Sequence, residues 1–280
     1  MSKTINLAAA LACSLVLGLL GTAAMAGCND DGPPCEVPLG TYHILVPEGG
    51  AEDLPAVMFL HGAGGTGKGA VNPNGMGRNL NARGYAAIGP NGLVREGRFG
   101  AGWYFHPERP KNRDEIAFLT QVADDAATRF GVDRMKIILG GFSIGGSMAS
   151  YVACDAPLSF AAYAPVGGSF WRPLPTECTG PVRLLHTHGW KDKTVPLEGR
   201  PLRSGVIYQG DVWQSMQAWR ATNGCDGLRA DSFDTIGDIM IRRWDTCAEG
   251  TALEFALHPG GHGIPRGWSD LALDWFEKLE

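Results

Sequence analysis

Short apolar segments alternate with longer amphipathic segments along this chain. Residues 56–60 (AVMFL) and 135–139 (MKIIL) are largely apolar, as expected of strands that are buried on both faces of a sheet. Residues 114–130 instead place apolar side chains at helical spacing. The same patterns predict strands at 41–46, 85–88, 160–166, 182–188, 239–243 and 253–257, and helices that end at Arg83 or span 211–222 and 268–279. Strands that alternate with helices indicate an α/β fold with a mostly parallel central sheet flanked by helices.

The sequence directly after residues 135–139 is Gly-Gly-Phe-Ser-Ile-Gly-Gly, which contains G-x-S-x-G. A buried strand before this motif and a helix of small residues after it are the context of a nucleophile elbow. Gly141 and Gly145 lack the β-carbons that would clash across so sharp a turn. The turn would lift the Ser143 hydroxyl off the sheet, beside backbone amides at the start of a helix. The alternative is a glycine-rich turn with an incidental serine.

Two more polar residues follow predicted strands. Asp192 comes after residues 182–188, and His262 lies in a glycine-lined loop after residues 253–257. The order Ser143, Asp192, His262 is the order of catalytic residues in α/β-hydrolases. We therefore expect His262 to take the Ser143 proton and Asp192 to orient the imidazole. Glu198 is the alternative acid, and Asp192 could instead cap a turn.

A glycine-containing turn, His-Gly-Ala-Gly-Gly, follows residues 56–60. In hydrolases with a nucleophile elbow, a turn at this place supplies an oxyanion-hole amide. The expected donors are the amides of Ala63 and Ile144. The overlapping sequence GAGGTGK fits the start of a phosphate-binding loop, but Gly69 stands where the magnesium-binding Ser or Thr would be, which disfavours a nucleotide site.

Aromatic residues gather in loops after the predicted strands. Trp103 lies in the irregular segment 93–112, and Trp171 and Trp190 follow two other strands. Such side chains often line a ligand cleft, so we predict that all three bind substrate. The alternative for 93–112 is a loop anchored by its own aromatic side chains. His186 and His188 share one strand face but have no evident third ligand, so no metal site is predicted.

The N-terminal segment has the features of a signal peptide. Lys3 precedes an apolar core that ends at Leu20, and small residues lead to Ala26. We expect residues 1–26 to be removed and residues 27–280 to form a single domain, secreted or periplasmic and not inserted in the membrane. A retained anchor and a lipoprotein anchored through Cys28 are the alternatives. Residues 27–40 are polar and turn-rich and are expected to lie on the surface.

The cysteines support export. One of the 7, Cys13, lies in the signal peptide, and an even set remains in the expected mature chain. Even numbers in an exported chain indicate disulfides. Pairing between neighbours in sequence predicts Cys28–Cys35, Cys154–Cys178 and Cys225–Cys247. The formal net charge of −5 and the lack of a basic cluster disfavour nucleic acid as a partner.

The segments LHGAGG, GGFSIGGSMASYVACDAP, FAAYAPVGG, HTHGWKDKTVP and GGHG resemble the secreted polyhydroxybutyrate depolymerase-like esterases. That group is similar to the feruloyl and acetylxylan esterases of carbohydrate esterase family one. The resemblance extends from about residue 40 to the C-terminus. It implies an α/β-hydrolase fold without a cofactor, and it assigns roles to Ser143, Asp192 and His262. The implied activity is hydrolysis of carboxylic esters through an acyl-enzyme, on feruloyl or acetyl polysaccharide esters or on hydroxyalkanoate oligoesters.

One residue of the elbow departs from this resemblance. Ile144 stands where relatives often have a small or polar residue, which is expected to alter the acyl pocket. Two other functions are possible for this fold, and the sequence disfavours both. A serine peptidase of this fold usually carries a large extra domain, for which the expected mature chain leaves no room. A catalytically silent binding protein would not need the three residues of the predicted triad.

Overall fold

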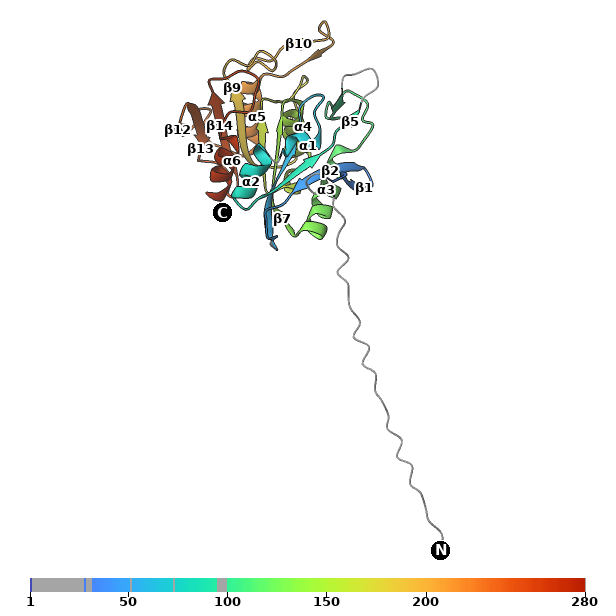
Figure 1. Cartoon of the computed structure of the whole chain (residues 1–280). Helices are drawn as coiled ribbons and strands as arrows, with labels where there is room; N and C mark the ends of the chain where they lie inside the picture. The colour runs from blue at the N-terminus through green and yellow to red at the C-terminus, as the bar shows by residue number, and fades with distance from the viewer. Residues whose placement is uncertain (2–27, 29–31, 51, 73, 95–99, 280) are drawn as a thin grey trace.

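The computed structural model describes residues 1, 28, 32–50, 52–72, 74–94 and 100–279 (Figure 1). The predicted signal peptide, apart from Met1, lies outside the described residues. Among the described residues, a ten-stranded sheet has the order β1-β2-β4-β3-β7-β8-β9-β14-β13-β12. Its strands are β1 (Cys35–Val37), β2 (Gly40–Leu45), β3 (Leu54–Leu60), β4 (Ala86–Pro90), β7 (Val132–Phe142), β8 (Ala162–Val166), β9 (Arg183–Gly189), β12 (Ser232–Ile236), β13 (Ile239–Trp244) and β14 (Ala252–His258).

The inner strands β4, β3, β7, β8, β9 and β14 are parallel. The outer strands at both edges are antiparallel. Four shorter strands form two separate pairs, β5 (Leu93–Val94) with β6 (Ala101–Gly102) and β10 (Pro201–Leu202) with β11 (Ile207–Tyr208). The sheet is therefore mostly parallel at its centre, as predicted, and the carboxyl ends of its inner strands lie along one edge.

Helices cover both faces of this sheet (Figure 1). They are α1 (Gly67–Ala70), α2 (Met76–Ala82), α3 (Glu115–Phe130), α4 (Ile144–Asp155), α5 (Val212–Thr222) and α6 (Trp268–Glu277), with a 3₁₀ turn at Pro157–Ser159. Apolar residues of α3, α4 and α5 form one core with the sheet, and those of α2 and α6 form a second core. Burial of these two apolar faces is the main force that stabilises a layered fold of this kind.

The start and the end of α3 follow from its sequence. The Asp114 carboxylate accepts a hydrogen bond from the amide of Ala117 at 3.0 Å and so caps the first turn. Gly131 ends the helix in the left-handed conformation, with φ of 69°. On the apolar face between these ends, Phe118 and Val122 are fully buried. The helix predicted at 114–130 is confirmed.

The predicted strands are all present, and two further strands of the ten-stranded sheet were missed, as were the four short strands of the separate pairs. β1 lies within residues 27–40, where no strand was expected, and it pairs with β2. β12 forms the far edge of the sheet and pairs with β13 alone. Its sequence, SFDTI, lacks an apolar run because most of its side chains are exposed. Strands at the edges of a sheet need only one neighbour and little burial, so hydrophobic pattern alone does not reveal them.

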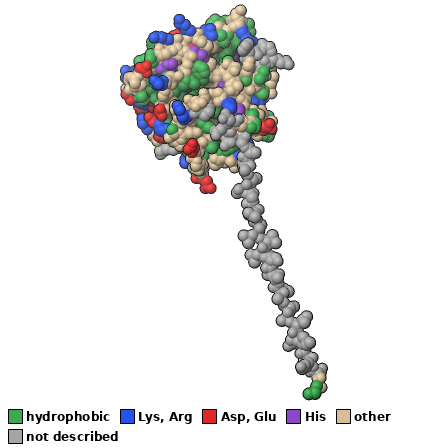
Figure 2. Space-filling model, in the orientation of Figure 1, with side chains coloured by type: hydrophobic (Ala, Val, Ile, Leu, Met, Phe, Trp, Pro, Cys, Tyr) green, Lys and Arg blue, Asp and Glu red, His purple; other side chains and the backbone are tan. Residues whose placement is uncertain are grey.

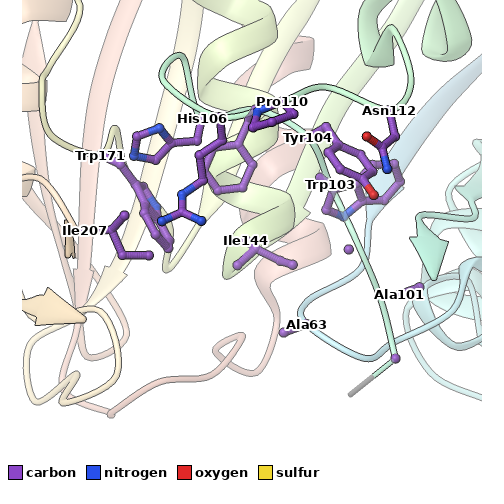
Figure 3. A pocket seen from close by; sticks show the side chains of 14 residues that line it. Ala63, Ala101, Trp103, Tyr104, His106, Pro110, Asn112, Ile144, Trp171 and Ile207 are labelled. Carbon is purple, nitrogen blue, oxygen red and sulfur yellow. The ribbon is translucent and has the colours of Figure 1, made fainter. Parts of the chain in front are cut away.

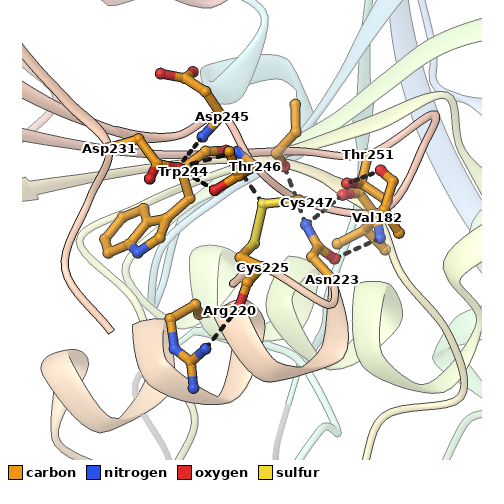
Figure 4. The surroundings of a disulfide bond; sticks show 12 residues. Val182, Arg220, Asn223, Cys225, Asp231, Trp244, Asp245, Thr246, Cys247 and Thr251 are labelled. Atoms are coloured by element: carbon orange, nitrogen blue, oxygen red, sulfur yellow. Dashed lines mark hydrogen bonds between the residues drawn. A yellow bond between two sulfur atoms is a disulfide. The ribbon is translucent and has the colours of Figure 1, made fainter. Parts of the chain in front are cut away.

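Three disulfides join the predicted pairs, Cys28–Cys35, Cys154–Cys178 and Cys225–Cys247. The third lies beside the buried side chain of Asn223, which follows α5 (Figure 4). The Asn223 amide accepts a hydrogen bond from the backbone N–H of Val182 at 2.9 Å and donates one to the Val182 carbonyl at 2.8 Å. Asn223 thus attaches the end of α5 to the chain that enters β9, and the disulfide attaches the segment after α5 to the loop between β13 and β14.

The surface mixes charges of both signs. Acidic and basic side chains are interspersed over the face that Figure 2 shows. Many of the acidic groups lie close to basic ones, as Arg83 does to Asp274 and Glu277 in α6. Within the described chain, no helix has the length and apolar character needed to cross a membrane.

Two histidines lie inside the sheet on β9. The His188 Nε2–H donates to the Val195 carbonyl at 2.8 Å, so His188 Nδ1 is free to accept from His186 Nε2 at 3.1 Å. Both rings are buried, and His186 Nδ1 has no hydrogen-bond partner. Burial lowers the pKa of His186 well below its ordinary value, and the neighbouring His188 lowers it further. Both rings are therefore neutral in the folded protein at neutral pH.

This burial makes the stability of the fold sensitive to acid. In the unfolded chain His186 regains an ordinary pKa of about 6.5, so below that pH the unfolded state binds a proton that the folded state does not. The free energy of unfolding is thus fully retained above pH 6.5 and falls as the pH drops below it. For His186→Gln, which keeps a donor but does not titrate, we expect a decline about 1 kcal/mol per pH unit shallower between pH 6 and 5. Urea unfolding at several pH values measures both slopes, and equal slopes would contradict a neutral buried His186.

Candidate active site

Ser143 sits at a sharp corner between β7 and α4. Its backbone has φ of 58° and ψ of −120°, a region that residues with a β-carbon rarely occupy. The Ser143 amide donates to the Val166 carbonyl of β8 at 2.9 Å, which fixes the corner to the neighbouring strand. A β-carbon at Gly145 would lie 2.2 Å from the Leu60 carbonyl oxygen, and one at Gly141 would lie 2.4 Å from that of Gly145. The two glycines of the motif are therefore required by close backbone packing, and this packing holds the strained serine.

The register of the parallel strands brings three loops to one edge of the sheet. Val166 in β8 pairs with Phe142 in β7 and with Thr187 in β9. At the end of β14, His258 pairs with Gly189 of β9. The loops after β7, β9 and β14 therefore start at nearly the same level, and these loops carry Ser143, Asp192 and His262.

The three predicted side chains form one hydrogen-bonded series. His262 Nε2 lies 2.9 Å from Ser143 Oγ, and His262 Nδ1 lies 2.7 Å from Asp192 Oδ2. The His262 ring also packs against the Phe142 ring, with 4.7 Å between centroids. Because a carboxylate only accepts, Nδ1 carries the proton in the neutral ring and Nε2 is left to accept from the serine hydroxyl. This arrangement suits proton removal from Ser143.

Asp192 is held on both sides. Its Oδ1 accepts hydrogen bonds from the backbone amides of Thr194 and Val195, each at 2.8 Å. The carboxylate is buried, and His188 Nε2 lies 3.6 Å from Oδ2, the oxygen that faces His262. These contacts leave Asp192 in a single orientation. Glu198, the alternative acid, is exposed.

The two amides expected to form an oxyanion hole flank the serine. Ala63 and Ile144 line the same cleft, and neither backbone N–H has an acceptor within the described part of the chain. A β-carbon at Gly62, next to Ala63, would lie 3.5 Å from Ser143 Cβ, so this turn runs directly past the serine. Two free donors beside one nucleophile are the feature that an oxyanion hole requires.

His61 fixes the turn that carries Ala63. Its Nδ1–H donates to the Gly62 carbonyl at 2.7 Å, and its Nε2 accepts from the Gly92 amide at 2.9 Å. Trp103 Nε1 donates to the His61 carbonyl at 2.9 Å, and the two rings are in contact. Burial lowers the pKa of His61, which keeps Nε2 unprotonated and able to accept.

A cleft of about 390 Å³ opens beside Ser143 and has largely aromatic walls (Figure 3). Such a volume suits a small ligand or part of a larger one. The residues that line it are Ala63, Gly100, Ala101, Gly102, Trp103, Tyr104, Phe105, His106, Arg109, Pro110, Asn112, Ile144, Trp171 and Ile207.

The three predicted substrate-binding tryptophans are placed differently. Trp103 and Trp171 both line the cleft, although Trp103 is 1% exposed and is also hydrogen-bonded to the turn at His61. The Trp171 indole N–H donates to Ser147 Oγ at 3.3 Å, and its ring is in edge contact with Phe105. Trp190 is 54% exposed and does not line the cleft.

Sequence reasoning did not single out the charged groups of the 104–115 segment. Arg113 and Glu115 form a buried ion pair at 2.7 Å, and Arg113 also donates to the Asn91 carbonyl. Glu115 Oε1 accepts from the Tyr104 amide at 3.0 Å, so the pair ties the start of α3 to the cleft wall. Arg109 and its neighbours lie in a segment without helical or strand periodicity, so their position could not be inferred.

Within the described residues, no three His, Cys, Asp or Glu side chains are grouped so that they could hold a metal ion.

Comparison with known proteins agrees with the geometry. Residues 42–207 match the Abhydrolase_2 family, described as phospholipase/carboxylesterase. NocK of Nocardia uniformis subsp. tsuyamanensis, which carries the name esterase, is 31% identical over 77% of this chain and 67% of its own length. Feruloyl esterase C of Emericella nidulans is 26% identical over 83% of this chain and 80% of its own length.

Solved structures show the same fold. The acetyl xylan esterase from Aspergillus awamori superposes with a TM-score of 0.64 at 18% identity, over 85% of this chain and 93% of that one. The family match covers more than half of the chain, and it includes the elbow, the turn at Ala63 and Asp192. The chain therefore belongs to the phospholipase/carboxylesterase family of α/β-hydrolases and is a carboxylic ester hydrolase similar to feruloyl esterases.

Proposed function

We propose that this protein is a secreted serine esterase that works through a Ser143–His262–Asp192 triad and an acyl-enzyme. The observation that carries the proposal is the hydrogen-bonded series from Asp192 Oδ2 through His262 to Ser143 Oγ, at 2.7 and 2.9 Å. The strained backbone of Ser143 and the two free amides at Ala63 and Ile144 support it.

In the first half-reaction, Ser143 Oγ attacks the ester carbonyl carbon while His262 Nε2 takes its proton. The carbonyl oxygen becomes an oxyanion, which the amides of Ala63 and Ile144 stabilise. His262 then gives the proton to the alcohol oxygen as the C–O bond breaks, and the acyl group remains on Ser143. In the second half-reaction a water molecule repeats these steps and releases the acid and the free serine.

Asp192 acts through His262. Its Oδ2 accepts from His262 Nδ1–H, which selects the tautomer with a free Nε2 and stabilises the imidazolium that forms in each step. The Thr194 and Val195 amides bind Oδ1 and keep Oδ2 facing the imidazole. No movement of the acid is therefore needed during the reaction.

The proposed substrates are feruloyl or acetyl esters of polysaccharides, or hydroxyalkanoate oligoesters. The names of relatives and neighbours support the first two, and the aromatic walls at Trp103, Tyr104 and Trp171 would pack against a ring or an alkyl chain. A panel of a feruloyl ester, acetylated xylan and short 3-hydroxybutyrate oligomers separates these classes by their kcat/KM values.

The proposed export rests on the sequence of residues 1–26 and on the disulfides. Three disulfides in one chain are typical of proteins from oxidising compartments. The N-terminal sequence of the protein recovered from its culture medium or periplasm tests this step, with Gly27 expected as the first residue.

Ser143→Ala tests the nucleophile. We expect a loss of about 10⁴-fold or more in kcat on 4-nitrophenyl acetate, because a triad without its nucleophile retains only binding and oxyanion stabilisation. Ser150→Ala is the matched control: its hydroxyl donates to the Gly146 carbonyl in the same helix and has no contact with His262. Equal activity of the two variants would exclude Ser143 as the nucleophile.

Asp192→Asn tests the acid. The side chain keeps its size, but an amide can leave His262 in the wrong tautomer, so kcat should fall by about 10³- to 10⁴-fold. Glu198→Gln removes the exposed alternative carboxylate and should leave kcat within about twofold of the wild type. Kinetics on the same aryl ester compare the two, and the reverse ranking would assign the acid to Glu198.

A further inference from the structure

Arg109 places a positive charge in the wall of the active-site cleft. It lines the cleft that also contains Ala63 and Ile144, the two expected oxyanion donors. No carboxylate of the described residues lies within 4.0 Å of its guanidinium. The nearby Arg113 differs, because it is paired with Glu115. A positive charge in the wall of the cleft is therefore available to a ligand.

One donor of Arg109 is also unsatisfied. Its Nε is buried and has no hydrogen-bond acceptor. A guanidinium carries five N–H donors in a rigid fork that matches the two oxygens of a carboxylate. Leaving the buried Nε–H without an acceptor is costly, so a ligand that supplies an acceptor gains from binding there.

The nearest acidic residue along the chain, Glu108, is exposed and forms no ion pair with Arg109. His106 is buried in the same wall, its Nδ1 accepts from the Glu108 amide at 3.2 Å, and its Nε2 has no hydrogen-bond partner. Burial lowers the pKa of His106, and the positive charge of Arg109 lowers it further, so the ring is neutral. The His106 ring meets the Trp171 ring edge to face at 5.9 Å, and both residues line the same cleft as Arg109.

We infer that Arg109 binds a carboxylate of the substrate, so that the preferred ester carries a free carboxylate away from its scissile bond. This inference rests on the serine-esterase function proposed above. A hydroxyalkanoate oligoester ends in such a carboxylate, whereas feruloyl and acetyl groups carry none. Arg109 therefore selects the oligoesters among the substrate classes already considered. The cleft walls at Trp171 and Ile207 would pack against the alkyl part of the same molecule.

The test compares two substrates that differ only in charge. One is the 3-hydroxybutyrate dimer with its free carboxylate, and the other is the same dimer with a terminal carboxamide. Release of 3-hydroxybutyrate is measured by chromatography, and 4-nitrophenyl butyrate serves as a neutral reference ester. We expect wild-type kcat/KM to be about 10- to 100-fold higher for the acid, mainly through a lower KM, because the charge is bound before and during the reaction.

Variants assign this preference to Arg109. Arg109→Gln should remove most of the preference, measured within each variant as the ratio of kcat/KM for the acid to that for the carboxamide, whereas Arg109→Lys should keep part of it. Lys111→Gln removes one positive charge from the same segment, but Lys111 is exposed and does not line the cleft, so the preference should remain.

Two results would overturn the inference alone. Wild-type enzyme that hydrolyses 4-nitrophenyl butyrate but treats acid and carboxamide alike excludes a carboxylate site. A preference that survives in Arg109→Gln but is lost in Lys111→Gln moves the site out of the cleft. Wild-type enzyme that hydrolyses none of the three esters would instead refute the proposed esterase function and the inference with it.

Discussion

The structure depends on one close backbone contact, the packing of the start of α4 against the ends of β3 and β7. Gly145 lies so near the Leu60 carbonyl that no side chain fits, and Ser143, two residues before Gly145, is held with a positive φ. Strain of this kind persists only where surrounding structure enforces it. Here the enforcing elements are the inner strands of the sheet, which are the most buried part of the fold. The backbone packing that stabilises the core therefore also holds the Ser143 side chain in place at the corner.

The parallel sheet explains how residues far apart in sequence meet. β9 and β14 pair over seven residues in register, from Ala252 with Arg183 to His258 with Gly189, so their loops leave the sheet together. The amides of Trp190 and Lys191 then donate to the carbonyls of His258 and Gly260, which join the two loops beyond the strands. This second set of bonds fixes Asp192 against the loop of His262. The positions of both side chains are therefore set by backbone hydrogen bonds.

The sequence predicts the parts of the site that depend on local chemistry. G-x-S-x-G after a buried strand identifies Ser143, and the polar loop residues after two later strands identify Asp192 and His262, because each position follows from turn geometry and chain order. The edge strands β1 and β12 were missed because they are short or largely exposed. The full length of β7 was also missed, because Asp133, Arg134 and Lys136 interrupt its apolar run. Arg109 could not be placed either. Its location in the cleft depends on the path of an irregular segment, and no periodicity encodes that path.

The most direct test of the account is covalent labelling of the resting enzyme with a fluorophosphonate, followed by peptide mass spectrometry. If Ser143 is the nucleophile, one stoichiometric adduct is expected, on the peptide that contains Ser143. Labelling should be slow when His262 is replaced by alanine, because the Ser143 hydroxyl then lacks its base. An enzyme that hydrolyses aryl esters but carries the adduct on another residue, or that labels equally fast without His262, would contradict the account.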